Sequence, residues 1–310
     1  MDSLKNMFSL PKNQPNLQNS DLILLILLTL LWGFNWPVMK DAVRELPPLY
    51  FRGLSMLGGL IALAIWIEWK KLPWKIPRAE WGNVIVLSIP NMVLWHLFVI
   101  YGVQLLSSGR AAVLGYTMPL WAALTALIWN REKIQKNLLV GLLAALLGTA
   151  LLIGHEWQSL AGKPLGVGFM LIAAGAWGFG TVLMRRMPIT ADTTVLTWWM
   201  LLITAPCMWL VSGLLEYDYW MWPNRREWLE ILYNAVLVFA FCHVVWFRLA
   251  RTLPPVVSSL SVMLIPVVGV FAGMLWLGEK PHWQDFAALV LLLIALASVQ
   301  FKKSAPTPAE

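Results

Sequence analysis

The chain has 310 residues, of which 59% are hydrophobic and 13% charged, and its mean hydropathy is +0.68. A soluble domain carries roughly 25% charged residues and could not bury this much apolar surface in one core, so the composition excludes a soluble globular protein and predicts a chain dissolved in a lipid bilayer. The net charge of +7 does not indicate nucleic-acid binding, because the basic residues fall between apolar segments instead of forming one patch.

Ten apolar segments follow one another along the chain, and each is suited to cross the roughly 30 Å of bilayer hydrocarbon. They are 22–40, 48–69, 81–103, 108–129, 137–153, 165–184, 193–215, 227–249, 255–277 and 283–301. Short connections rich in proline, glycine or charge separate them, such as KKLPWKIPRAE and RTLPP. We therefore expect an all-α membrane protein with ten transmembrane helices.

The two ends of the chain, 1–20 and 302–310, are polar and are predicted to be disordered tails. The first apolar segment follows a polar stretch and ends without a small-residue cleavage site, so we expect it to be a transmembrane helix and not a cleaved signal. If the ten segments cross in turn, most of the 23 lysines and arginines lie on the side of the N-terminus. The positive-inside rule then places both termini in the cytoplasm. We expect a multi-pass protein of the inner (plasma) membrane.

The two halves of the chain carry the same markers in the same order. The tripeptide W-G-F at 32–34 returns at 177–179. A histidine, a proline and a glutamate also recur at spacings of 23 and then 13 residues: His96, Pro119 and Glu132, and then His243, Pro266 and Glu279. Each half has five segments, and this odd number places the second copy upside down relative to the first. We predict two inverted five-helix repeats, 21–154 and 165–301, joined by a linker at 155–164.

The chain resembles the EamA family of the drug/metabolite transporter superfamily, of the bacterial amino-acid/metabolite exporter type. The resemblance is carried by LLWGFNWPVMKDAVRELPPLYFRGLSMLGGLIALAI, by LLVGLLAALLGTALLIG, and by GYTMPLWAALTALIWNRE and SVMLIPVVGVFAGMLWLGEK, which each have a central proline and a terminal glutamate. It extends from about residue 22 to 301, although the last segment lacks the glycines frequent in the family. The resemblance implies a secondary transporter that exports small metabolites, especially amino acids or related compounds.

Charged residues are expected only near the ends of the apolar segments: Glu68, Glu230, Asp285, Arg52, Arg110 and Arg248. A charge deep in the bilayer is costly and usually marks function. This pattern therefore argues against a carboxylate proton relay and against a basic clamp for phosphate groups. The sequence predicts a central cavity without charge, used for alternating access.

Neutral polar and aromatic side chains occupy the segment centres. Asparagine and histidine offer hydrogen-bond donors and acceptors, and tryptophan offers a flat apolar wall, which together suit a small zwitterionic or aromatic solute. The predicted substrate-binding residues are Trp32, Asn35, Asn91, Trp95, His96, Tyr116, Trp177 and His243. Hydrogen bonds between helices are the alternative role for the asparagines and histidines, and a histidine could also couple transport to protons.

Prolines within apolar segments predict hinges, because proline removes one helical hydrogen bond and bends the helix. The predicted gating or hinge residues are Gly33, Pro37, Pro119 and Pro266. Small residues follow two of these prolines, at 122 and 126 and at 269 and 273, and would allow close helix contact. A static kink is the alternative interpretation.

Other functions have less support in the sequence. A drug or sugar permease of the same fold is the alternative within transport, and a non-transporting membrane scaffold or sensor is the alternative from another class. An enzyme is disfavoured because H-E-x-x-H, G-x-S-x-G and a pair of mid-segment aspartates are all missing. We expect no catalytic residues, no metal, no cofactor and no nucleic-acid partner. The expected partners are a small-molecule substrate and the lipid bilayer, and a monomer is compatible with the sequence.

Overall fold

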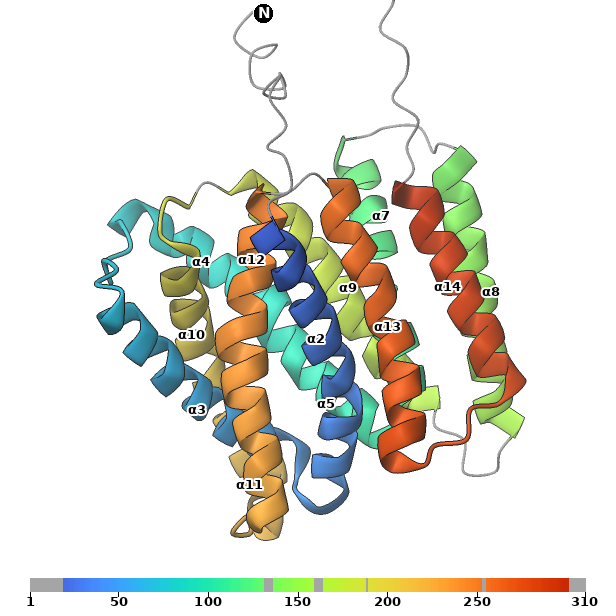
Figure 1. The fold of residues 1–310 in the computed structure, drawn as a ribbon, viewed down its shortest axis with the longest axis horizontal. Helices are drawn as coiled ribbons and strands as arrows, with labels where there is room; N and C mark the ends of the chain where they lie inside the picture. The colour runs from blue at the N-terminus through green and yellow to red at the C-terminus, as the bar shows by residue number, and fades with distance from the viewer. Residues whose placement is uncertain (1–18, 131–135, 159–163, 188, 253–254, 301–310) are drawn as a thin grey trace, which may run out of the picture.

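The computed structural model describes residues 19–130, 136–158, 164–187, 189–252 and 255–300 (Figure 1). Throughout these ranges the regular structure is helical and no strand occurs, which confirms the all-α prediction. The helices run side by side between two ends of the molecule, with the N-terminus of α2 at the upper end in Figure 1.

The first half of the chain forms a series of helices, two of which are interrupted. It comprises α2 (Asn19–Glu45), α3 (Pro48–Trp69), the short 3-10 helix η1 (Arg78–Glu80), α4 (Trp81–Ser88), the π-helix η2 (Ile89–Leu94), α5 (Trp95–Leu105), α6 (Ser108–Gly115), α7 (Met118–Asn130) and α8 (Lys136–Gln158).

The second half repeats much of this pattern. It comprises α9 (Pro164–Arg186), α10 (Thr193–Leu215), the 3-10 helix η3 (Tyr217–Tyr219), α11 (Arg225–Leu232), the π-helix η4 (Tyr233–Cys242), α12 (His243–Thr252), α13 (Pro255–Leu277) and α14 (Trp283–Gln300). Cys207 and Cys242 are both free thiols.

Seven helical stretches of the described chain are long and apolar enough to cross a membrane. They are Leu22–Glu45, Pro48–Trp69, Arg78–Leu105, Ser108–Trp129, Pro164–Met184, Thr193–Leu215 and Arg225–Arg248. Three shorter apolar helices, Leu139–Leu151, Leu264–Leu277 and Trp283–Ser298, fall within the other predicted segments. Large apolar side chains such as Ile65, Leu146 and Leu275 remain exposed on the outer surface, as expected where lipid is the solvent.

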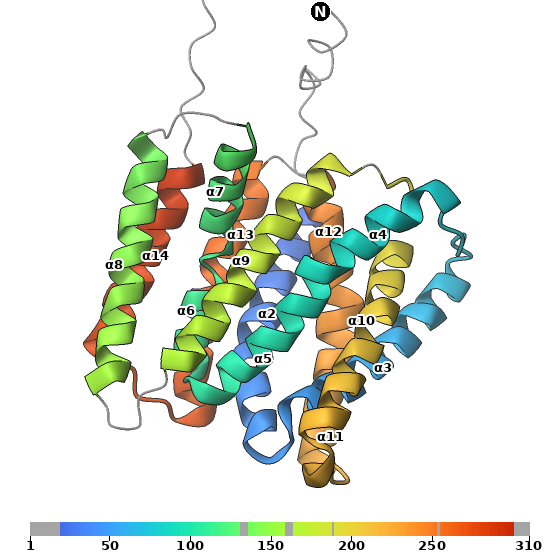
Figure 2. The same cartoon turned by 180° about the vertical axis from the view of Figure 1, so that it is seen from behind.

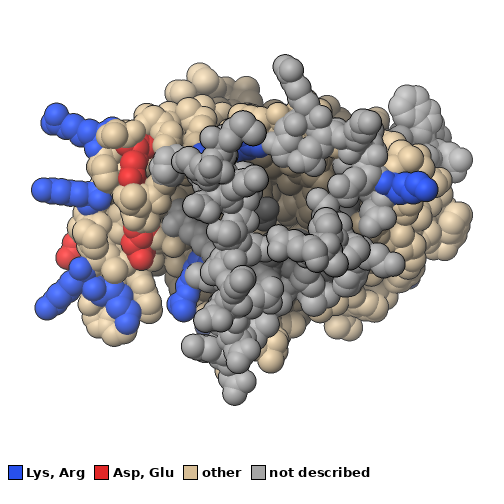
Figure 3. All heavy atoms as spheres, turned by 90° about the horizontal axis from the view of Figure 1, so that it is seen from above, with Lys and Arg blue, Asp and Glu red and all other residues tan. Residues whose placement is uncertain are grey.

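The helices form three regions across the molecule (Figures 1 and 2). α8 pairs with α14 at one edge, α3, α4 and α10 form the other edge, and α2, α5, α9 and α13 lie between them. α2 runs downward from the upper end, whereas α9 runs upward. Basic residues mark the upper end, because the α3–α4 connection carries Lys70, Lys71, Lys75 and Arg78, and Figure 3 shows basic side chains gathered at one edge of that end.

The glycine of each W-G-F motif lies at a close contact between helices. A Cβ added to Gly33 on α2 would lie 3.3 Å from the carbonyl oxygen of Ile265, and still closer to the Val268 side chain on α13. A Cβ added to Gly178 on α9 would lie 2.6 Å from the carbonyl oxygen of Met118, at the start of α7.

These two contacts are equivalent in the two halves. The Gly178 position also meets Cβ of Trp121 at 2.7 Å. Ile265 and Val268 follow Met118 and Trp121 by the same interval that separates His96 from His243. The repeated glycine therefore allows the first helix of each half to pack against the proline-bearing segment of the other half.

The predicted proline hinges differ in structure. The fourth apolar segment is broken at Tyr116 and Thr117, between α6 and α7, and the Thr117 hydroxyl donates to the Leu114 carbonyl at 2.7 Å. Pro119 is the second residue of α7, where its missing N–H leaves no helical bond unmade. Pro37 and Pro266 instead lie inside α2 and α13, which continue through them.

Candidate functional site

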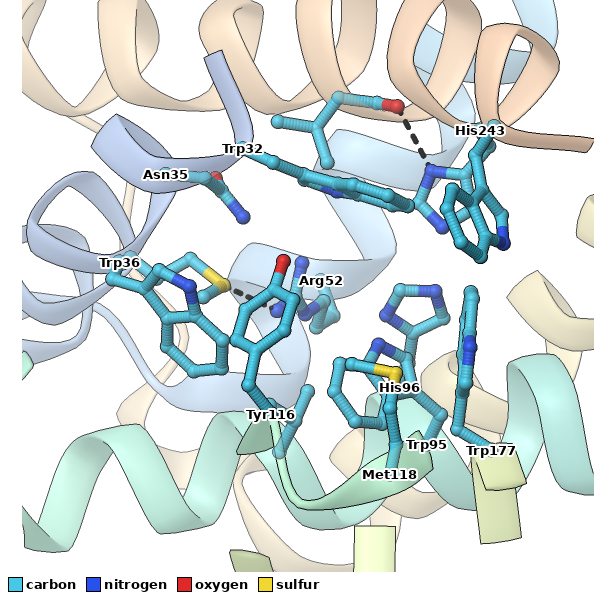
Figure 4. A pocket seen from close by; sticks show the side chains of 14 residues that line it. Trp32, Asn35, Trp36, Arg52, Trp95, His96, Tyr116, Met118, Trp177 and His243 are labelled. Carbon is cyan, nitrogen blue, oxygen red and sulfur yellow. Dashed lines mark hydrogen bonds between the residues drawn. The ribbon is translucent and has the colours of Figure 1, made fainter. Parts of the chain in front are cut away.

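A cavity lies between the two halves of the chain (Figure 4). It contains about 530 Å³ of empty space, counted with its open side. α2, α3, α5, the break between α6 and α7, and α7 of the first half, with α9, η4 and α12 of the second half, surround it. The lining residues are Trp32, Asn35, Trp36, Met39, Arg52, Trp95, His96, Val99, Tyr116, Met118, Trp177, Val238, His243 and Trp246.

The structure brings together seven of the eight predicted substrate-binding residues at this cavity: Trp32, Asn35, Trp95, His96, Tyr116, Trp177 and His243. Asn91 is placed elsewhere. Its Nδ2 donates to the Leu87 carbonyl at 3.1 Å, and its amide packs against α9 where Gly180 leaves room. Asn91 thus supports a helix contact and does not line the cavity.

Aromatic rings form much of the wall. Trp32 meets the ring of His243 edge-on, with centroids 5.5 Å apart, and Trp95 lies 5.1 Å from Trp177. On the other side, Trp36 meets Tyr116 edge-on at 6.1 Å. Because such edge contacts restrict the rotation of each ring, the wall presents a set of fixed flat surfaces to a solute.

The two repeated histidines lie next to each other in the wall of the cavity. The ring centroids of His96 and His243 lie 5.6 Å apart. Nδ1 of His243 bonds the carbonyl oxygen of Val238 at 2.8 Å. Since a carbonyl only accepts, Nδ1 carries a proton, and in the neutral ring Nε2 is then an acceptor. Nε2 of His243 and both ring nitrogens of His96 are buried and have no hydrogen-bond partner within the described chain.

A π-helical segment precedes the histidine in each half. η2 ends just before Trp95 and His96, and η4 ends just before His243. At the end of η4, the backbone N–H of His243 also donates to the carbonyl of Val238, five residues earlier. Such segments occur frequently at functional sites because they redirect side chains. The apolar pattern of the sequence contains no signal for them.

Arg52 overturns the prediction that the cavity carries no charge. Its side chain lines the cavity and only 1% of its surface is exposed. Nη1 donates to Oδ1 of Asn234 at 3.3 Å, Nη2 donates to the sulfur of Met39 at 2.7 Å, and Nε has no partner within the described chain. The prediction was wrong because it placed Arg52 by its position near the start of the segment, whereas the side chain points inward to Met39 on α2 and Asn234 on η4.

Two other mid-segment tryptophans lie outside the cavity lining. The indole N–H of Trp198 donates to the Leu60 carbonyl at 3.1 Å, and that of Trp199 donates to the Trp74 carbonyl at 3.0 Å. In the described chain no group of three histidine, cysteine, aspartate or glutamate side chains is arranged to hold a metal ion.

Comparison with known proteins identifies the family. The model of the EamA-like transporter family matches residues 19–154 and 164–300, which is most of the chain. The chain belongs to the EamA-like transporter family. This confirms the resemblance seen in the sequence, and both matched regions of this EamA-like transporter contribute residues to the cavity.

Individual relatives are transporters by name, and a solved structure shares the fold of the chain. The "Uncharacterized transporter YoaV" of Bacillus subtilis (strain 168) is 29% identical over 260 residues, covering 83% of this chain and 88% of the relative. The "Probable amino-acid metabolite efflux pump" of Salmonella typhimurium is 27% identical over 295 residues, covering 90% and 94%. A crystal structure with 20% identity matches the fold with a TM-score of 0.65, over 90% of this EamA-like transporter and 97% of that chain.

Proposed function

We propose that this protein is a secondary transporter that exports small metabolites, with amino acids or related compounds as the main class. The observation that carries the proposal is the set of polar atoms around the cavity. Buried polar atoms normally have hydrogen-bond partners. Within the described chain, five of the eight buried side-chain atoms without a partner belong to cavity residues: Oδ1 of Asn35, Nε of Arg52, Nδ1 and Nε2 of His96, and Nε2 of His243. A solute bound among these residues would supply the missing hydrogen-bond partners.

The proposed architecture is two inverted five-helix halves, 21–154 and 165–301, with ten membrane crossings. The opposite directions of α2 and α9 support it, as do the equivalent contacts of Gly33 and Gly178 with the other half. A cavity between two such halves suits alternating access, because each half can close one end of the pathway.

Polar contacts between the halves support a closed lower end in Figure 1. The contacts are Glu216 with the first turn of α3, Asp41 with Arg226, Arg110 with Asp285, and Glu279 with Ser108. At the upper end, the described polar side-chain contacts between the halves include the exposed pair of Glu80 and Thr190. We therefore propose that opening the lower end requires the four contacts to break. With both termini in the cytoplasm, this end faces away from the cytoplasm.

The proposal can be tested with the full-length protein in liposomes. Fluxes of amino acids, sugars and cationic drugs would be measured with and without a pH gradient. Flux of amino acids is expected, and its acceleration by the gradient would identify proton coupling. Flux restricted to sugars or drugs would support the permease alternative, and a protein that moves no compound of this panel would support a scaffold or sensor.

Removal of the His96 side chain should impair transport. His96→Ala deletes two buried, partnerless nitrogens of a residue that lines the cavity, and a hydrogen bond to a neutral group contributes about 1 kcal/mol, so we expect roughly fivefold weaker half-saturation for the solute. His282→Ala is the matched control, because His282 is exposed and does not line the cavity. Equal fluxes for wild type and His96→Ala would remove His96 from the site.

A further inference from the structure

We infer that Arg52 binds the carboxylate group of the solute, so that the substrates are small monocarboxylates with an apolar or aromatic body. The inference rests on the proposed transport function and deepens it. It starts from a fully buried guanidinium group on the wall of the cavity, which the composition of the apolar segments did not predict.

The positive charge of Arg52 is not neutralised by the protein. Within the described residues Arg52 forms no ion pair with a carboxylate. Its partners are neutral: the Asn234 oxygen, the Met39 sulfur, and the ring faces of Phe51 and Phe239, whose centroids lie 6.0 and 5.8 Å from Cζ. Such contacts stabilise a cation but leave its charge uncompensated. A buried charge without a counter-ion is strongly unfavourable, and a carboxylate group on the solute would supply the counter-ion.

The charge of the cavity indicates a solute with a single negatively charged group. Arg52 is the one lysine or arginine among the lining residues, and no aspartate or glutamate belongs to the lining. A carboxylate would balance this single positive charge. A phosphate monoester carries close to two negative charges at neutral pH, and one of them would remain unpaired in an apolar site. The partnerless Nε of Arg52 is a donor suited to a carboxylate oxygen.

The surroundings of Arg52 suit the rest of such a molecule. Figure 4 shows Asn35, Trp36 and Tyr116 around the same space as Arg52, with His96 and Trp32 on its other sides. Flat rings can cover an apolar or aromatic body. The partnerless Oδ1 of Asn35 can accept a hydrogen bond from an amino group. Neutral amino acids combine a carboxylate with an amino group and such a body, whereas a cationic drug without a carboxylate would be repelled by Arg52.

The test compares matched ligands on the purified full-length protein. Binding of neutral amino acids, of the corresponding amino-acid amides and of phosphate monoesters would be measured by titrated thermal shift for wild type, Arg52→Gln and Arg52→Lys. A charge-assisted hydrogen bond corresponds to a 10- to 100-fold change in affinity. Wild type should bind the carboxylates at least tenfold more tightly than the amides or the phosphate esters. Arg52→Gln should weaken carboxylate binding 10- to 100-fold and should not weaken amide binding, because the amides are cations that Arg52 repels, and Arg52→Lys should restore part of the loss.

The controls separate binding from structure. Arg78→Gln changes an exposed arginine in η1 and should leave every affinity unchanged. Equal binding of carboxylates and amides by wild type, or no carboxylate binding at all, would overturn the inference without any mutant. An equal loss for both ligands in a folded Arg52→Gln protein would also overturn it, since a purely structural role predicts that result. The proposed transport function can fail separately from this inference. In that case the protein would still prefer carboxylates in the binding experiment but would show no flux in liposomes.

Discussion

Glu216→Ala is expected to destabilise the protein by about 3 kcal/mol or more. The carboxylate is 6% exposed and accepts hydrogen bonds from the backbone N–H groups of Leu49 and Tyr50 at 3.0 Å, and from the hydroxyls of Tyr101 and Ser212 at 2.9 Å. The residue before α3, Pro47, provides no side-chain cap, so Glu216 caps α3 from the other half of the chain. Each buried donor left without a partner costs about 1–3 kcal/mol.

Thermal denaturation of the purified protein would measure this effect. Asp218→Asn is a suitable control, because Asp218 lies two residues away and is exposed. Glu216→Gln retains the size of the side chain but not its charge, and should cost less than Glu216→Ala. If Glu216→Ala were as stable as the control, the proposed role of Glu216 in joining the halves would be wrong.

Gly178→Ala is expected to destabilise the protein by about 2 kcal/mol and to reduce transport. The added Cβ would meet the Met118 carbonyl oxygen at 2.6 Å and the backbone nitrogen of Ala122 at 2.7 Å. Backbone atoms cannot rotate away, so α9 and α7 must separate. Overpacking of this kind typically costs about 1–3 kcal/mol. Because this contact lies beside Met118, which lines the cavity, the separation should also alter the site.

The same helix supplies the control for this prediction. A Cβ added to Gly168 on α9 meets nothing within 4 Å, so Gly168→Ala should retain flux and keep or slightly raise stability. Flux in liposomes and the midpoint of thermal unfolding would be compared for both variants. Equal behaviour of the two would show that the close approach of α9 to α7 is not required.

Much of the cavity could be predicted from the sequence because a lipid bilayer fixes the depth of each residue of an apolar segment. Neutral polar and aromatic residues near the centre of an apolar segment lie at mid-depth whichever way the helix is turned, and the proposed inverted repeat would bring repeated residues such as His96 and His243 together near its axis. The sequence does not determine the face on which a residue lies. Asn91 therefore has the expected depth but packs against α9 at Gly180, outside the cavity.

The features that escaped prediction depend on contacts between residues distant in sequence. Arg52 is near the start of α3, yet its side chain lines the cavity and bonds Asn234 in the other half of the chain. Glu216 caps Leu49, 167 residues away in the chain. The π-helices η2 and η4 have no residue signature, since they result from how a helix accommodates its neighbours.

Disulfide cross-linking of α6 to α13 tests alternating access between the two halves most directly. A Cβ added to Gly109 on α6 would lie 3.6 Å from Cβ of Val270 on α13, within the range of native disulfides. Gly109→Cys and Val270→Cys would be combined in a protein whose Cys207 and Cys242 are replaced by alanine. Flux in liposomes should stop when the disulfide forms and return when it is reduced. Undiminished flux through fully cross-linked protein would contradict the mechanism.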